Sequence, residues 1–525
     1  MQTDWLVLLP PFLVIALAFL THRVLLSLIL GIIAGALIVS NFSIIGAVQI
    51  LSKTTCAQFD PSNLYTFGFL LVLGSLISLI SLTGGTLAYG ALIKKRLLNA
   101  RMAESASVLL SFCFAIDDFF SILTVGSIMK PVTDTFKIPR VKLAFLLDSL
   151  AAPLIILVPV STWVAMILMQ LEKAGISTNS STNPLIFEDP LAFYLQTIPF
   201  VFYSFLIAFS VIFIVRTGSS WGPMAQAEEL ARKKGDIFWG AQAITSSPSA
   251  LPTNGSIIDF IFPIATLLLS VFASILYLGD SSLLGGTHSL AQTMQHTDIF
   301  LALFAGACVA FISSFALALM RGSIKLGQLS EIVNGGYLLM KDSIAILFLA
   351  WAFGTLLKND LHTGDYIASL IVGSVNASFL PAAFFLAALV TAVGTGSSWG
   401  TIAVLVPLAI PLVTSFISNE TPLALHDALL TLPVIGAIFA GAVAGDHVSP
   451  IGTTTIMSAA TAQTEINAHV YSQLPYAAPA LVGAFFAFLS AGYLIKYGIW
   501  SSCLISLFIG ALIALALLIV QRKTS

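Results

Sequence analysis

Apolar segments long enough to cross a lipid bilayer recur along this chain from one end to the other. Hydrophobic residues make up 58% of the 525 positions and charged residues 9%, whereas about a quarter of the residues in a soluble domain are charged. A helix needs roughly 20 apolar residues to span the hydrocarbon core. The chain is therefore predicted to be an all-α polytopic membrane protein, not a soluble domain or a β-barrel. Its formal net charge of −2 gives no indication of a nucleic-acid partner.

The apolar runs predict spanning helices at residues 5–21, 24–50, 66–93, 141–171, 191–215, 256–279, 298–320, 334–357, 428–461, 474–496 and 500–521. The first run is expected to remain in the mature protein, because its positive charge, Arg23, follows the run, whereas a cleaved signal peptide has positive charges before it. The four cysteines lie far apart and fit no metal-binding spacing, so we expect no cofactor and no redox chemistry.

The distribution of lysine and arginine predicts the orientation in the membrane, because these residues are enriched on the cytoplasmic side. When the loops are assigned to alternating sides, 18 of the 22 lysines and arginines fall on one side. The exceptions are Lys53, Lys173, Lys358 and Lys496. That side is predicted to be cytoplasmic. The result is a multi-pass protein of the cytoplasmic (inner) membrane, with its N-terminus outside and its C-terminus in the cytoplasm.

Two further apolar runs, 103–129 and 382–413, must each enter and leave on the same side for this assignment to hold. We therefore predict two re-entrant hairpins that enter from opposite faces. A weak internal match supports their relationship, since Asp117 precedes Pro131 by the same fourteen residues that separate Ser397 from Pro411.

The hairpins divide the chain into two helical bundles of opposite orientation. The predicted domains are a first inverted repeat at 1–215, a cytoplasmic linker at 216–255, a second inverted repeat at 256–497 and an extra C-terminal span at 498–525. Inverted repeats with discontinuous helices are the architecture of alternating-access carriers. Within the linker we expect a short amphipathic helix at 225–234, and we treat its Gly-Ser-Ser-Trp-Gly sequence, which recurs at 396–400, as a chance match.

Two of the predicted spans are expected to be broken helices. Residues 141–171 would extend about 46 Å as one helix, which exceeds the roughly 30 Å core, and they contain Pro159. Residues 428–461 are interrupted near Pro450. Polar groups and free backbone at this depth are tolerated only where protein or a water-filled cavity covers them. We predict two broken transmembrane helices whose breaks, together with the hairpin tips, form the functional site.

Adjacent acids, Asp117 and Asp118, are expected near the tip of the first hairpin. Two neighbouring carboxylates in a low dielectric cannot both ionise cheaply, so one site can hold either a proton or a monovalent cation. The structural alternative is that one of the two acids lies at the interface and only forms a salt bridge.

The broken spans contribute further candidates. Asp148 lies in the first broken span, where an ion pair with Arg140 or Lys142 is the structural alternative to a role in the site. Asp446 and His447 lie within the second broken span, far in sequence from any lysine or arginine. His447 is expected to relay protons or to donate to a carbonyl freed by the break. The other six histidines are expected in loops or at span ends.

Hydroxyl groups beside glycines and prolines complete the candidate ion-binding set. They are Ser161, Thr162, Ser397, Ser398, Ser449, Thr453 and Thr454. Na⁺ is a hard cation suited to hydroxyl, carbonyl and carboxylate oxygens. Packing and backbone hydrogen bonding are the alternative roles for such residues in membrane helices.

Six segments carry a family resemblance: 115–126, 129–131, 148–153, 159–163, 394–400 and 445–451. In these segments, which follow the same order in both halves, the chain resembles the NhaC family of Na⁺/H⁺ antiporters in the ion transporter superfamily. The resemblance implies inverted hairpins and broken helices, a homodimer, and exchange of Na⁺ for H⁺. It also implies relatives that exchange organic acids such as malate and lactate. Residues 452–455 depart from the serine and aspartate found in part of the family.

The leading hypothesis is a Na⁺/H⁺ antiporter whose partners are Na⁺, H⁺, the lipid bilayer and a second copy of the chain. The alternative is a sodium-coupled carrier or exchanger of a small organic acid or amino acid. The tips and breaks contain no lysine or arginine to bind a carboxylate, which favours cation exchange. An enzyme is not expected, because an intramembrane aspartyl protease would need glycine at Val443. Two half-sites at helix breaks also favour an occluding carrier over a channel.

Overall fold

The computed structural model describes residues 5–21, 23–85, 88, 97–179, 184–240, 255–288, 293, 297–363, 366, 376–417 and 422–523. These residues are helical almost throughout, which confirms the all-α fold class. Nine of the described helices are long and apolar enough to cross a membrane. The sheet among the described residues is a single parallel pair, β1 (Ile186–Phe187) and β2 (Leu423–Ala424), which ties together loops from the two halves of the chain.

The helices of the first half follow the apolar runs. They are α1 (Leu9–Thr21), α2 (Val24–Val39), α3 (Ile44–Cys56), α4 (Pro61–Leu82), α6 (Ala100–Cys113), α7 (Asp118–Thr135), α8 (Arg140–Leu150), α9 (Ala152–Ile155), α10 (Thr162–Ala174), α11 (Pro190–Thr197) and α12 (Phe202–Thr217). The linker contains α13 (Gly222–Lys234), so the short helix predicted at 225–234 is present.

The second half repeats this pattern of long and interrupted helices. Its helices are α14 (Ile258–Leu278), α16 (Ile299–Met320), α17 (Leu329–Thr355), α19 (Leu380–Thr395), α20 (Ser398–Ile417), α21 (Thr431–Val448), α22 (Thr453–Ala462), α23 (Ile466–Leu494) and α24 (Ile499–Lys523).

The single span predicted at 24–50 is wrong, because the structure has two helices there. A turn separates α2 from α3, and its residues Asn41 and Phe42 have φ values of 52° and 62°. Asparagine tolerates this left-handed conformation better than most residues. Ser43 then caps α3 by accepting the Gly46 N–H at 3.2 Å. The polar residues within the apolar run were the local signal for this turn.

Other predicted runs also end or divide earlier than expected. The span predicted at 191–215 divides into α11 and α12 at a 3-10 turn, Ile198–Phe200, where Pro199 supplies no backbone N–H. The span predicted at 66–93 begins earlier, as α4, which ends at Leu82. Of its remaining positions, 86–87 and 89–93 lie outside the described residues.

The two runs predicted as hairpins each consist of two helices that contact each other. The first run is α6 and α7, and the second is α19 and α20. Their interruptions lie at 114–117 and 396–397. The re-entrant course of both runs through a membrane stays a prediction.

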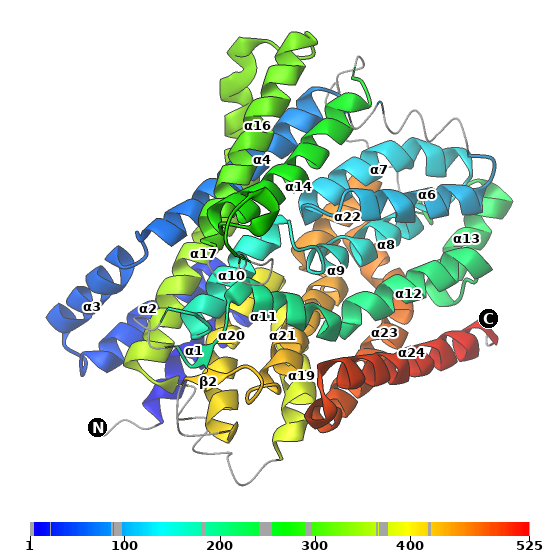
Figure 1. Cartoon of the computed structure of the whole chain (residues 1–525). Helices are drawn as coiled ribbons and strands as arrows, with labels where there is room; N and C mark the ends of the chain where they lie inside the picture. Colours follow the sequence, from blue (N-terminus) through cyan, green and yellow to red (C-terminus); the bar gives the residue numbers. More distant parts are fainter. Residues whose placement is uncertain are drawn as a thin grey trace.

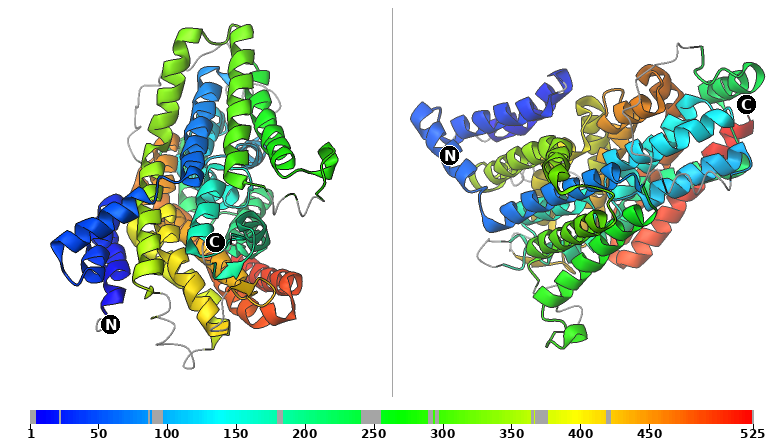
Figure 2. Two further views of the ribbon diagram at one scale, coloured as in Figure 1. Left: turned by 60° about the vertical axis from the view of Figure 1, so that its left-hand side comes forward. Right: turned by 90° about the horizontal axis from the view of Figure 1, so that it is seen from above.

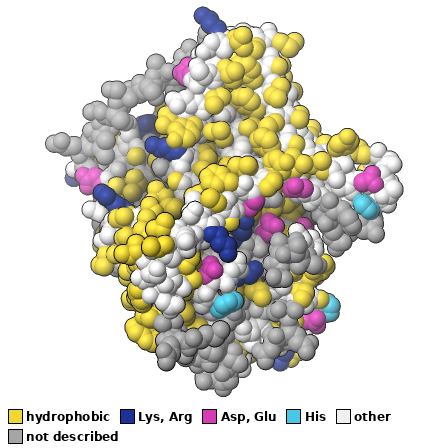
Figure 3. Space-filling model, turned by 90° about the vertical axis from the view of Figure 1, so that its left-hand side faces the viewer, with side chains coloured by type: hydrophobic (Ala, Val, Ile, Leu, Met, Phe, Trp, Pro, Cys, Tyr) yellow, Lys and Arg dark blue, Asp and Glu magenta, His cyan; other side chains and the backbone are white. Residues whose placement is uncertain are grey.

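Helices α8 and α21 lie at the centre of the bundle, and the other helices surround them (Figure 1). Helices α1–α3 lie at one edge and α24 at the opposite edge in all views (Figures 1 and 2). Helices α4, α14, α16 and α17 pack together and project from the rest of the molecule. Hydrophobic side chains cover much of the outer face shown in Figure 3, as expected for a lipid-facing surface.

The interior is built around α8 and α21. Every residue of α8 is buried, and so is α21 from Thr431 to His447. A helix that is buried on all sides lies at the centre of a large bundle. The breaks that follow these two helices therefore start from buried segments, although Pro159 and Pro450 within them are exposed. An unsatisfied polar group on the buried side of a break is costly.

Candidate functional site

The second break separates α21 from α22 at residues 449–452. Ser449 adopts an extended conformation, as a residue before proline prefers. Asp446, in the last turn of α21, then reaches across the break. Its Oδ1 accepts the Thr453 backbone N–H at 3.1 Å and its Oδ2 accepts the Thr454 hydroxyl at 3.3 Å. The carboxylate thus caps the first turn of α22, where the helix dipole favours negative charge.

Close packing holds this break in shape. A Cβ atom at Gly452 would lie 2.2 Å from the Asp446 carbonyl oxygen, so only glycine fits. The Thr455 hydroxyl donates to the same carbonyl oxygen at 3.1 Å. At Gly396, which has a φ of 63°, a Cβ atom would lie 2.3 Å from the Ile451 carbonyl oxygen. The interruption between α19 and α20 therefore packs directly on the break between α21 and α22.

The predicted hydroxyl residues of the second half bind mainly backbone. Ser398 donates to the Ala442 carbonyl at 3.2 Å and Ser449 donates to the Val393 carbonyl at 2.7 Å. Ser397 accepts the Gly400 N–H at 3.0 Å, and Thr453 donates to the Gly396 carbonyl at 3.5 Å. The backbone-bonding role considered for these residues is therefore present, and their bonds connect the α19–α20 interruption with α21 and the start of α22.

The first half has an equivalent arrangement at its hairpin tip. Asp117 caps α7 by accepting the Phe120 N–H at 2.9 Å. The Thr162 backbone N–H donates to the Ile116 carbonyl at 3.1 Å. These contacts join the tip to the break between α9 and α10, and the Thr162 hydroxyl lies beside the Asp117 carboxylate. In this break Ser161 donates to the Val158 carbonyl at 3.2 Å.

The two halves meet crosswise. Helix α7 packs on α22, with Gly126 against Thr461, and α20 packs on α10, with the Trp163 and Trp399 rings 5.8 Å apart in an edge contact. The second hairpin helix of each half thus contacts the distal segment of the broken helix of the other half. This crossing brings both tips and both breaks into one region.

The four predicted acids are connected by pairwise electrostatic interactions in this region. Asp118 interacts electrostatically with both Asp117 and Asp446, and Asp446 interacts in turn with Asp148. All four side chains are buried, and Asp148 is 0% exposed. Asp117 caps α7, whereas Asp118 is the acid of the pair that interacts electrostatically with Asp446. Among the described residues, no three His, Cys, Asp or Glu side chains come close enough to hold one metal ion by themselves.

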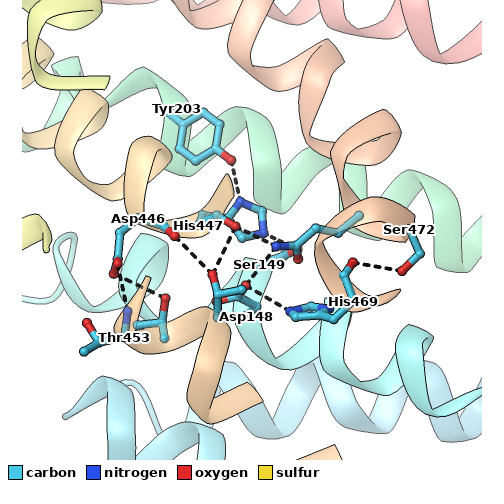
Figure 4. A network of polar contacts seen from close by, with 11 residues as sticks. Asp148, Ser149, Tyr203, Asp446, His447, Thr453, His469 and Ser472 are labelled. Atoms are coloured by element: carbon cyan, nitrogen blue, oxygen red, sulfur yellow. Dashed lines mark hydrogen bonds and ion pairs between the residues drawn. The ribbon is translucent and has the colours of Figure 1, made fainter. Parts of the chain in front are cut away.

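Asp148 anchors a network that joins four helices, α8, α12, α21 and α23 (Figure 4). Its Oδ2 lies 3.2 Å from His469 Nε2 and accepts a bond from Gln473 Nε2 at 3.1 Å. The same amide nitrogen lies 2.6 Å from the His447 carbonyl oxygen. His447 in turn contacts the Tyr203 hydroxyl at 2.6 Å through Nδ1 and the Ser149 hydroxyl at 3.1 Å through Nε2.

The proposed alternative for Asp148 is wrong, because its basic neighbours have other partners. Arg140 pairs with Asp134 at 2.7 Å. Lys142 pairs with Glu104 at 2.7 Å and with Glu228 at 2.6 Å. Asp148 instead contacts His469 and Gln473.

His469 is the main residue that sequence analysis missed. It lies in the first turn of α23, at a span end as expected, but it is 0% exposed and contacts Asp148. Residues 469, 473 and 476 are spaced so that they share one face of α23. A polar face of this kind on an otherwise apolar helix was the available signal. Tyr203 and Ser149 gave no such signal, because each is a single polar residue in an apolar run.

The recurring Gly-Ser-Ser-Trp-Gly sequence is more than a chance match. Gly218 and Gly396 share a φ of 63° and end α12 and α19 in the same way. Their tryptophans differ in contacts, because Trp221 stacks on Tyr476 with ring centroids 4.2 Å apart. The two copies therefore encode the same helix-ending turn, and the one at 218–222 joins the linker to α23.

An all-helical membrane protein that buries several acids beside interrupted helices has the design of a secondary transporter. The chain belongs to the Na⁺/H⁺ antiporter family, whose family model matches residues 154–493. This result agrees with the resemblance found in the sequence.

Individual relatives extend the comparison. The chain is 32% identical over 491 residues to an uncharacterized protein of Haemophilus influenzae, an alignment that covers 92% of this chain and 90% of that protein. Over 200 residues it is 26% identical to the malate-2H⁺/Na⁺-lactate antiporter of Bacillus subtilis, covering 37% of this chain and 38% of the relative. The YdaH transporter of Alcanivorax borkumensis has a similar fold, with a TM-score of 0.54 at 15% identity and coverage of 87% and 90%.

Proposed function

We propose that this protein exchanges Na⁺, or its smaller analogue Li⁺, for H⁺ across the cytoplasmic membrane. The observation that carries the proposal is the position of Asp446, a buried acid that caps α22 across a helix break and lies in electrostatic range of Asp118. Buried carboxylates that face one another need a neutralising partner. A proton and a monovalent cation can each fill that need, and because they compete for it, the two ions are exchanged.

The cation site would use both halves of the protein. Asp118 and Asp446 supply charge, while the Thr162 and Thr454 hydroxyls and the freed carbonyls of the breaks supply neutral oxygens. Oxygen ligands of this kind suit a hard cation. Asp117, Ser161, Ser397, Ser398, Ser449 and Thr453 shape the site through their helix-capping and backbone contacts.

The network around Asp148 would handle the proton. His469 and Gln473 donate toward the Asp148 carboxylate, and His447 connects it to Tyr203. The electrostatic interaction between Asp148 and Asp446 couples this network to the cation site. Binding of a cation at one site therefore disfavours binding of a proton at the other. This mutual exclusion is the requirement for exchange.

Alternating access would come from the crosswise packing of the two halves. We assign residues 1–215 and 256–497 to inverted repeats, joined by the linker at 216–255 and followed by the extra span at 498–525. Hairpin tips that enter from opposite faces would open the site to one side at a time. The N-terminus would lie outside and the C-terminus in the cytoplasm, and the protein would work as a homodimer.

Proteoliposomes with an imposed pH gradient test this proposal. Addition of Na⁺ or Li⁺ should dissipate the gradient, and Asp118→Asn and Asp446→Asn should each abolish the response while the protein still inserts. Asp360→Asn, which changes an exposed acid, should keep wild-type activity. Failure of both Na⁺ and Li⁺ to dissipate the gradient would exclude cation exchange.

The alternative is a sodium-coupled exchanger of small organic acids, which the Bacillus subtilis relative favours by its name. Against it, Arg140 and Lys142 are held by acidic partners, so neither is free to bind a substrate carboxylate. Uptake of labelled malate or lactate that requires a sodium gradient would reverse the order of the two proposals.

A further inference from the structure

An apolar groove runs between α6 and α12 and has a volume of about 290 Å³. Leu109 and Phe112 line it from α6, and Ile212 and Val215 line it from α12. Leu109 is 58% exposed and Phe112 46% exposed. In a protein of this class these side chains face lipid, so the groove is a recess in the lipid-facing surface of the first predicted hairpin.

One end of the groove is basic. Arg216, in the last turn of α12, lines it directly. Arg101 lies one turn before Ser105, a groove residue on the same face of α6. Its guanidinium lies over Gly218, where a Cβ atom would be only 2.8 Å from a guanidinium nitrogen. Arg101 and Arg216 therefore flank the same end of the groove, at the start of α6 and the end of α12.

Both guanidinium groups are available. Among the described residues, neither Arg101 nor Arg216 donates a hydrogen bond or forms an ion pair, and both are exposed. The acid nearest to Arg101 in sequence is Glu104, which interacts with Arg101 electrostatically but forms its ion pair with Lys142, at 2.7 Å. Guanidinium groups bind phosphate through paired N–H donors, and basic recesses between membrane helices bind anionic lipid headgroups.

We infer that this groove binds an anionic phospholipid, with its phosphate between Arg101 and Arg216 and an acyl chain against Leu109, Phe112 and Ile212. The apolar length and the basic end match the two chemical parts of such a lipid. The bound lipid would lie on α6, which belongs to the predicted hairpin that contains Asp118. This inference does not depend on which ion the protein carries.

Native mass spectrometry of the full-length protein in detergent tests the site, using phosphatidylglycerol and phosphatidylcholine of equal chain length. We expect phosphatidylglycerol to bind more tightly to the wild type. The double variant Arg101→Gln with Arg216→Gln should lose about tenfold or more of that affinity, because charge-assisted bonds are lost. Ile212→Trp, which fills the groove without changing charge, should also weaken binding. Arg232→Gln, at an exposed arginine of α13, is the matched control and should bind as the wild type does.

Equal binding of the two lipids by the wild type would overturn the inference, as would an unchanged double variant of native melting temperature. A loss of equal size in Arg232→Gln would show general surface attraction and would also overturn it. Full retention of lipid affinity in Ile212→Trp would show that the lipid does not occupy the groove and would also overturn the inference. Competition by glycerol phosphate at the concentration of the lipid would indicate a site for free phosphate instead.

Discussion

His469 Nε2 lies 3.2 Å from Asp148 Oδ2, and this contact joins α23 to α8 across 321 positions of the sequence. Both side chains are fully buried. Removing a hydrogen-bond donor from a buried carboxylate costs more free energy than removing it from an exposed one, because no water replaces the lost bond. The pair therefore couples the position of α23 to the charge on Asp148.

The variant His469→Leu should lower the initial rate of ion exchange about tenfold or more, because Asp148 then keeps only the Gln473 donor. His469→Gln can still donate and should retain more activity. Rates measured in proteoliposomes across a range of pH would separate the two variants. His426→Gln removes an exposed histidine and serves as the control. Equal rates for His469→Leu and the wild type would remove this pair from the mechanism.

Gly452→Ala should destabilise the protein by about 1–3 kcal/mol, the usual cost of overpacking. Its Cβ atom would meet the backbone oxygen of Asp446 at 2.2 Å and Oδ1 at 2.8 Å, so the cap on α22 must shift. A thermal melt and the exchange rate should both fall. Gly327→Ala is the matched control, since no atom lies within 4 Å of its added Cβ. An unchanged melt and rate in Gly452→Ala would contradict the geometry of the break.

Lys142→Met should destabilise the protein by about 3–5 kcal/mol, because it leaves the buried Glu104 and the partly exposed Glu228 without their ion-pair partner. It should also loosen α13, which carries Glu228, from α8. Melting temperature and limited proteolysis of the linker would show both effects. Lys233→Met breaks only an exposed pair with Glu229 and should leave the melt almost unchanged. An equal fall in melting temperature in the two variants would mean that burial of the ion pair does not determine its contribution to stability.

Asp189 lies outside the spanning helices, where it caps α11 by accepting the Ala192 N–H at 2.8 Å. Burial raises the pKa of Asp189 to about 6, from about 3.9 in an unfolded chain. The folded state thus favours the protonated acid. The resulting stability is present below pH 4 and is lost as the pH rises through 6.

The variant Asp189→Asn cannot ionise and keeps a good capping residue. Relative to the wild type it should gain stability between pH 4 and pH 7, by up to about 3 kcal/mol for a shift of this size. Melts recorded at several pH values would measure the gain. Asp298→Asn, at an exposed cap of α16, should show no comparable trend. A constant difference between Asp189→Asn and wild type at all pH values would refute the assignment.

The sequence determined the features that depend on local chemistry. The length of the apolar runs identified the membrane helices. Pro159 and Pro450 located the two breaks, because proline lacks a backbone N–H and disfavours helical geometry in the residue before it. Proline alone was not sufficient as a signal, since Pro131 and Pro407 lie inside continuous helices. The family also followed from sequence, since its motifs lie in short segments. The error at Asn41 was of the same local kind, a turn signal overlooked inside an apolar run.

The tertiary structure decided which distant residues meet. Asp118 and Asp446 come into range only because α7 packs on α22, and Asp148 finds His469 only because α23 packs on α8. The membrane-spanning helices are apolar over most of their surface, so hydropathy does not specify which helices pack against one another. Packing of small residues and a few buried hydrogen bonds makes that choice in a membrane protein. These contacts become visible only when the helices are assembled.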